Sequence, residues 1–230
     1  MENNLNFKTY LLVIKKNFII SVRDDSNKKI YEEKLDLKKE IDDINFEMLD
    51  NFLNQNIFKI EKKIGNFIKK ILIVTDLEDF LTVEVSVKKK ISDNSVDLKY
   101  LLNEAKDSCK NTIDERRIVH MIINSYCIDD IIYSSLPKDF KCKNFSIDVR
   151  LICLSNILIK NFEDILKKYQ ISLSKIISAK YLNEFMVDDK SDIFSVIKSI
   201  VEGYNPNEVI LADKTSKKVG FFEKFFNFFS

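Results

Sequence analysis

Residues 145–185 read FSIDVRLICLSNILIKNFEDILKKYQISLSKIISAKYLNEF and change hydrophobic pattern twice. The apolar run over residues 145–155 is typical of a strand. Asn156 is a suitable N-cap for the helix predicted over residues 156–170. The apolar residues of 171–180 then predict another strand. This strand, helix, strand order indicates an α/β protein with mixed sheets.

The rest of the chain extends the mixed order without the regular βαβ rhythm of a doubly wound sheet. Three strands joined by polar turns are predicted over residues 9–17, 18–27 and 28–37. Further strands are predicted over 69–76, 80–90 and 116–130, and helices over 44–65, 95–111 and 192–204. The apolar positions of the first helix, which Gly65 ends, are Ile44, Phe46, Met48, Leu49, Phe52, Leu53, Ile57 and Phe58.

Composition sets broad bounds on the function. Of 230 residues, 45% are hydrophobic and 32% are charged, which is typical of a globular protein. The net charge of +1 comes from 37 basic and 36 acidic residues spread along the chain, a balance that argues against nucleic-acid binding. The four cysteines form no CxxC pair and no secretory signal precedes them, so we expect reduced thiols in the cytoplasm. No apolar run reaches the roughly 18 residues that span a bilayer.

The chain ends in VGFFEKFFNFFS, residues 219–230. On a helix, its six phenylalanines occupy an arc of roughly 160°, opposite Glu223, Lys224, Asn227 and Ser230. The phenylalanines are Phe221, Phe222, Phe225, Phe226, Phe228 and Phe229. Lysines beside them, at Lys217, Lys218 and Lys224, suit an anionic membrane surface. Docking on a protein partner or on the chain's own core is the alternative.

Two segments together resemble the bacterial cell-division protein FtsA, a family of actin-like proteins. RRIVHMIINSYCIDDI, residues 116–131, is similar to the first strand of the family's inserted subdomain, and residues 145–185 are similar to the strand and helix that follow it. The matching positions are Ile118, His120, Ile122, Tyr126, Ile128, Asp129, Val149, Leu151, Asn161, Ile171 and Ala179. Family members also end in a linker and a short amphipathic membrane-targeting helix.

The resemblance implies a partial actin-like fold with the FtsA-type inserted subdomain and a C-terminal amphipathic helix. It divides the chain into a degenerate first actin-like subdomain (1–78), the inserted subdomain (79–180), a helical segment (181–204), a linker (205–218) and a membrane-targeting helix (219–230). It covers most of residues 1–187 and the last dozen.

The departures from the family concern nucleotide binding. Family members open with a glycine-containing phosphate loop, because backbone N–H groups can wrap a phosphate only where side chains are absent. The corresponding hairpin here, LLVIKKNFIISVRD, has neither glycine nor threonine. By the resemblance, we expect the second actin-like lobe, on which the tubulin-like FtsZ docks in the family, to be missing after Phe185. We therefore expect no ATP cofactor and no ATPase activity.

Other chemistry finds little support among the residues. His120 is the single histidine, and its alternation with Ile118 and Ile122 predicts a structural role on the buried face of a strand. The Asp pairs at 24–25, 42–43, 129–130 and 188–189 fall in turns or at helix starts. We expect no catalytic, cofactor-binding or metal-ligating residues.

These observations predict a non-catalytic, FtsA-like adaptor on the cytoplasmic face of the inner membrane. It would self-associate through about residues 80–180 and bind division proteins, either FtsZ or later septal proteins. Two alternatives stay open. One is an ATP-binding actin-like protein with diverged phosphate loops, and the other is a soluble scaffold whose tail docks on protein.

Overall fold

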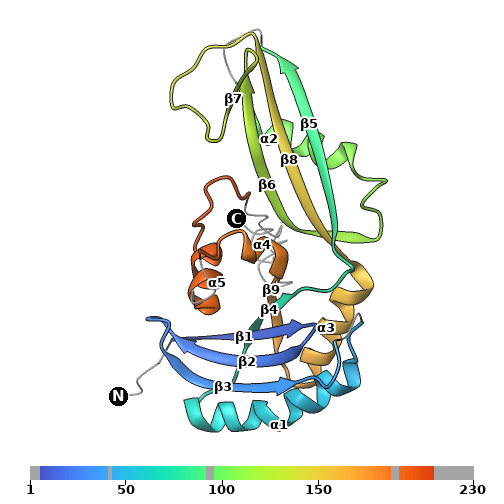
Figure 1. The fold of residues 1–230 in the computed structure, drawn as a ribbon, viewed down its shortest axis with the longest axis vertical. Helices are drawn as coiled ribbons and strands as arrows, with labels where there is room; N and C mark the ends of the chain where they lie inside the picture. The colour runs from blue at the N-terminus through green and yellow to red at the C-terminus, as the bar shows by residue number, and fades with distance from the viewer. Residues whose placement is uncertain (1–5, 41–42, 92–95, 188–191, 210–230) are drawn as a thin grey trace, which may run out of the picture.

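The computed structural model describes residues 6–40, 43–91, 96–187 and 192–209, which form two sheets with helices around them (Figure 1). The first sheet has the strand order β3-β2-β1-β4-β9. Its strands are β1 (Phe7–Ile14), β2 (Asn17–Asp24), β3 (Lys29–Asp36), β4 (Lys70–Thr75) and β9 (Ser172–Ser178). The predicted antiparallel meander β1-β2-β3 is confirmed, and β4 and β9 extend it with parallel pairings.

Both faces of the first sheet are covered, which explains why β1 is apolar at consecutive positions. Leu11 and Val13 face α1 (Phe46–Ile64) and α3 (Asn156–Lys168), while Tyr10 and Leu12 face α4 (Ala179–Asn183) and α5 (Ile193–Val201). In Figure 1, α1 lies beneath this sheet, and α4 and α5 lie between it and the second sheet.

Local capping fixes α1 where the sequence predicts it. The side chain of Asn45 accepts the N–H of Met48, and Gly65 ends the helix at a φ of 68°, the left-handed conformation that favours glycine. Its buried face holds Leu49, Phe52, Leu53, Ile57 and Ile60, but Phe58, which the apolar pattern placed on that face, is 73% exposed.

The second sheet has the order β5-β8-β6-β7 and is antiparallel throughout. Its strands are β5 (Leu81–Lys90), β6 (Arg116–Ile128), β7 (Ile131–Tyr133) and β8 (Asn144–Ser155), and α2 (Leu98–Ser108) packs against it. Asp129 and Asp130, at φ values of 45° and 70°, make the tight turn into β7. This turn was predicted, but the short strand after it was not.

The stretch 145–185 joins the two sheets. Strand β8 starts in the second sheet, and near its end Cys153 packs into that sheet's core while Leu154 packs into the core of the first. The helix that follows is capped by Ser155, whose Oγ accepts the N–H of Leu158, so the prediction of Asn156 as the cap is wrong by one residue. Strand β9 then pairs with β4, because α3 carries the chain across the first sheet as a parallel crossover.

Strand β9 therefore lies in the first sheet, whereas the sequence analysis grouped residues 79–180 as one inserted subdomain. The hydrophobic pattern of a strand shows that it is buried, but it does not show which strand it pairs with. The four cysteines are free, as predicted. None of the helices within the described residues is both long and apolar enough to cross a bilayer.

Candidate functional site

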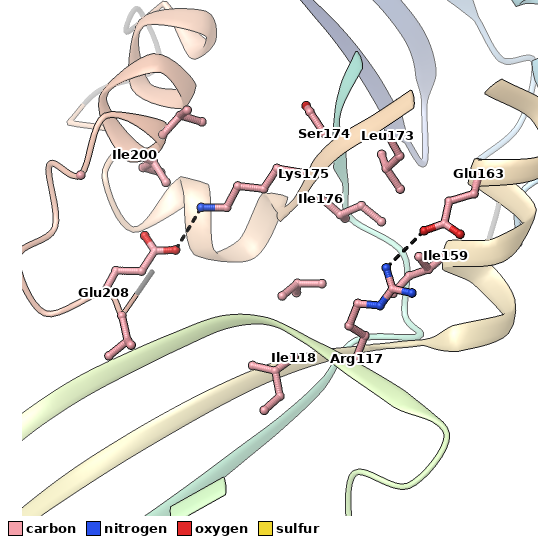
Figure 2. Close-up of a pocket in the computed structure, with 14 residues that line it drawn as sticks. Arg117, Ile118, Ile159, Glu163, Leu173, Ser174, Lys175, Ile176, Ile200 and Glu208 are labelled. Carbon is pink, nitrogen blue, oxygen red and sulfur yellow. Dashed lines mark hydrogen bonds and ion pairs between the residues drawn. The ribbon is translucent and has the colours of Figure 1, made fainter. Parts of the chain in front are cut away.

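A groove with a volume of about 440 Å³ lies where the two sheets meet (Figure 2). One wall is the start of β6, with Arg117, Ile118 and Val119. The opposite wall is β9, with Leu173, Ser174, Lys175 and Ile176, and α3 contributes Ile159 and Glu163. Figure 2 shows apolar side chains between the walls and an ion pair toward each side.

Both strand walls have a free edge within the described residues. β9 is the last strand of the first sheet and pairs only with β4. The first residues of β6 pair with β8 on one side. Their other side is free, because residues 207–209 cover that edge only at Met121–Ile123 and β7 covers it only at Tyr126–Ile128. Unpaired N–H and C=O groups on an edge strand are ready to pair with an added strand. The groove thus combines apolar and charged side chains with backbone hydrogen-bonding groups.

The two ion pairs at the groove differ in burial. Arg117 Nη1 lies 3.2 Å from Glu163 Oε1, and both side chains are about half exposed. Lys175 Nζ lies 3.4 Å from Glu208 Oε1, and only 7% of the Glu208 side chain is exposed. The exposed pair contributes little to stability and can open for an incoming chain, whereas the buried carboxylate needs its partners.

His120 is buried beside the groove and shares the partner Glu208 with Lys175. The Ser178 N–H donates to His120 Nε2 at 3.2 Å, so Nε2 carries no proton and the neutral ring has its proton on Nδ1. Nδ1 in turn donates to Glu208 Oε1 at 2.8 Å. The imidazole is buried and packs on the Tyr181 ring with a centroid distance of 4.4 Å. This confirms the predicted burial of His120 and shows what its polar atoms bind.

Glu208 belongs to a segment that the sequence analysis assigned to a polar linker. The Ile123 N–H donates to the Asn207 carbonyl, and the Val209 N–H donates to the Met121 carbonyl, so residues 207–209 cover the edge of β6 at Met121–Ile123. Tyr181 Oη also donates to Glu208 Oε2 at 2.9 Å. Residues 205–209 are therefore fixed on the folded body, which the polar sequence NPNEV could not indicate, because the partners of Glu208 lie on distant elements.

The β1–β2 hairpin corresponds, by the resemblance, to the first phosphate loop of FtsA proteins. Here the Lys15 N–H donates to Asp76 Oδ1 at 2.9 Å, and Lys15 Nζ lies 2.7 Å from Glu78 Oε1. A carboxylate thus accepts a backbone amide of this hairpin. The predicted membrane-binding residues Lys217, Lys218, Phe221, Phe222, Lys224, Phe225, Phe226, Phe228 and Phe229 lie outside the described residues.

Neither a protein-family model nor a curated protein matches the sequence. Among solved structures, the PilM–PilN type IV pilus biogenesis complex matches with a TM-score of 0.52 and 8% identity, over 77% of this chain and 49% of that chain. The cytoplasmic domain of EpsL, an inner-membrane component of the type II secretion system of Vibrio cholerae, matches with a TM-score of 0.41 and 10% identity over 77% and 59%. A Bacteroides thetaiotaomicron protein of unknown function with an actin-like ATPase fold gives a TM-score of 0.32 and 10% identity over 78% and 55%.

The chain has a mixed α/β fold of the actin-like type. It spans about half of the PilM–PilN chain that it matches. At such low identity the likeness shows the fold alone. It supports the actin-like part of the sequence interpretation and does not single out FtsA.

The His120 site makes stability depend on pH. Burial lowers the pKa of His120 below its usual 6.5, although the hydrogen bond to Glu208 acts in the opposite direction. As the pH falls, His120 becomes protonated in the unfolded chain before it does so in the folded one. The contribution of neutral His120 to folding stability is therefore complete above about pH 6.5 and decreases as the pH falls below it. We expect the thermal midpoint to fall from about pH 7.5 to about pH 5.5, and to fall less in His120→Gln. Equal slopes for the two proteins in differential scanning fluorimetry would contradict this assignment.

Proposed function

We propose that this chain is a non-catalytic, actin-like adaptor that binds a protein partner in the inter-sheet groove and attaches to the inner membrane through residues 219–230. The groove carries the first half of this proposal, because the free edge of β9 and the first residues of β6 border one channel that has both apolar and charged side chains. The solved PilM–PilN structure is itself a complex, which supports a protein partner for this fold. Division proteins, either FtsZ or later septal proteins, are the partner class that the FtsA resemblance favours.

An extended partner segment suits the groove better than a folded surface. Such a segment would pair its backbone with the edge of β9 and place alternate side chains between Ile118 and Ile176, the mode known as β-augmentation. The Arg117–Glu163 pair would open to admit it, at small energetic cost because both side chains are partly exposed.

A photo-crosslinking amino acid at Leu173 tests the groove, with the same amino acid at Ile157 as the matched control. Leu173 lines the groove, whereas Ile157 is 70% exposed on α3 away from it. In the native cell, we expect one dominant crosslinked partner from position 173 that is absent from position 157. A peptide of the crosslinked segment should then bind the purified chain, and Leu173→Pro should weaken it. Identical crosslinks from both positions would contradict a groove-bound partner.

The tail carries the second half of the proposal, from sequence alone. Burying a phenylalanine fully contributes about 1.5–3 kcal/mol, and an interfacial helix buries each ring only in part. Ordering a dozen residues costs on the order of 1 kcal/mol each. One tail should therefore hold the membrane weakly and reversibly, and self-association of the adaptor would supply avidity.

Co-sedimentation with vesicles of phosphatidylglycerol tests the anchor by comparing the full chain with a chain that ends at Lys218. We expect the full chain to pellet more, because the shortened one lacks all six tail phenylalanines. The described residues end at 209 and are unchanged in the shortened chain. If both chains pellet equally, the anchor is refuted and a tail that docks on protein takes its place.

Independence from ATP is supported by the β1–β2 hairpin. Asp76 accepts the amide of Lys15, and Glu78 pairs with the ammonium group of the same residue, so carboxylates already occupy two groups of the hairpin that could bind a phosphate. The residues present do not fit a phosphate group. An ATP-binding protein with diverged loops would need another cradle of backbone N–H groups.

Titration calorimetry with Mg–ATP tests this independence. We expect no saturable heat up to millimolar nucleotide and no change in the thermal midpoint, since a carboxylate would have to be displaced from the hairpin. Saturable binding in the micromolar range would revive the ATP-binding alternative. The partner and membrane experiments remain informative in either case, because they depend on other residues.

A further inference from the structure

Two phenylalanines project into solvent at the end of α1. Phe58 is 73% exposed and Phe67 is 74% exposed, and both border one shallow depression with Ile57, Ile68 and Tyr169. Single exposed apolar residues are ordinary on soluble proteins. Two large exposed aromatic rings beside one depression, in contrast, indicate an interaction site.

The local backbone holds both rings outward. Ile57 and Ile60 face the core, so Phe58, one position after Ile57, points away from it. Gly65 then ends the helix in the left-handed conformation. The Asn66 side chain accepts the Phe67 N–H at 2.9 Å, and Glu61 Oε1 accepts the Ile68 N–H at 3.1 Å. The turn that carries Phe67 is therefore fixed by hydrogen bonds rather than exposed by lack of structure.

Positive charge surrounds the rings. Residues 57–70 contain five lysines and one acidic residue, a net charge of 5 − 1 = +4, whereas the whole chain carries +1. The lysines are Lys59, Lys62, Lys63, Lys69 and Lys70, and all five are exposed. None of them forms an ion pair with another described residue, and Glu61 is already engaged by Ile68. Lysines are frequent throughout this chain, so the unusual feature here is the lack of acids among them.

We infer that this aromatic–lysine patch, Phe58 and Phe67 with the five lysines, is a second membrane contact that binds the surface of an anionic bilayer. Phenylalanine rings enter the interface between headgroups and acyl chains, while lysines attract acidic headgroups. The two rings project from the surface, so they suit a soft planar surface. Lysine supplies compact point charges for diffuse headgroups, and the patch has no arginine, the residue that recognises phosphate in a bidentate manner.

The patch lies close enough to the tail, residues 219–230, for both to contact one membrane. This step rests on the proposed function of the tail. The Ser172 N–H donates to the Lys69 carbonyl, and three residues further along β9, Lys175 reaches Glu208. Three strand residues span about 10 Å. Residues 210–218 separate Val209 from the tail and reach at most about 30 Å. Both contacts can therefore meet one bilayer, and two linked weak contacts gain avidity.

Vesicle binding of the double variant Phe58→Ser with Phe67→Ser tests the patch. Vesicles of equimolar phosphatidylcholine and phosphatidylglycerol are compared with phosphatidylcholine alone, for the full chain and for the chain ending at Lys218. We expect partitioning of the double variant to the anionic vesicles to fall roughly tenfold in both chain lengths. The triple variant Lys62→Gln, Lys69→Gln, Lys70→Gln should show a similar loss, and added salt should weaken binding of the unmodified chain.

Matched controls come from the second sheet. Ile131 and Ile132 are 59% and 72% exposed, so Ile131→Ser with Ile132→Ser removes similar apolar surface elsewhere. Replacing Lys88, Lys89 and Lys90 by glutamine removes the same charge. Both controls should change partitioning less than about twofold.

The outcomes separate the patch from the tail. If patch and control variants partition alike in the shortened chain, or if that chain binds no anionic vesicles, the patch is refuted and the tail proposal stands. If the patch variants lose binding while removal of the tail changes nothing, the tail proposal fails and the patch stands. Equal binding to phosphatidylcholine alone would remove the role given to the lysines.

Discussion

The neutral imidazole of His120 is the contact on which the relation between the two sheets depends. It lies on β6 of the second sheet, accepts a backbone N–H from the end of β9 in the first, and donates to Glu208. A neutral imidazole has one acceptor and one donor nitrogen, so it can make both hydrogen bonds. Burial lowers the pKa of the ring, which favours this neutral form. This pair of hydrogen bonds joins β6 both to the end of β9 and to Glu208.

The sequence predicts local structure well because periodicity reports the burial of each face. The meander, α1 with its Gly65 end, the long strands and the buried position of His120 all follow from that signal. Pairing between distant strands leaves no such signal, so the sheet to which β9 belongs had to come from the structure. Glu208 was missed for the same reason, since its three partners lie on β6, β9 and α4.

Phe58 shows the limit of the hydrophobic pattern. An apolar residue next to the buried stripe of a helix is counted with the core, although a rotation of about 100° per residue turns it toward solvent. The mixed charges of the whole chain similarly hid the excess of lysine over residues 57–70. The membrane-targeting helix predicted over residues 219–230 is the opposite case. The separation of its phenylalanines from its polar residues is visible in the sequence, whereas residues 210–230 lie outside the described structure.

The unbroken course of β8 has a mechanical consequence. The strand runs from the ladder with β5 in the second sheet to Leu154 in the core of the first, and continues through Ser155 directly into α3. A tensile load applied to the second sheet therefore passes along covalent backbone into the first core. Ten residue pairs align β8 with β5, so a pull along the strands loads that ladder in shear and spreads the force over many hydrogen bonds at once.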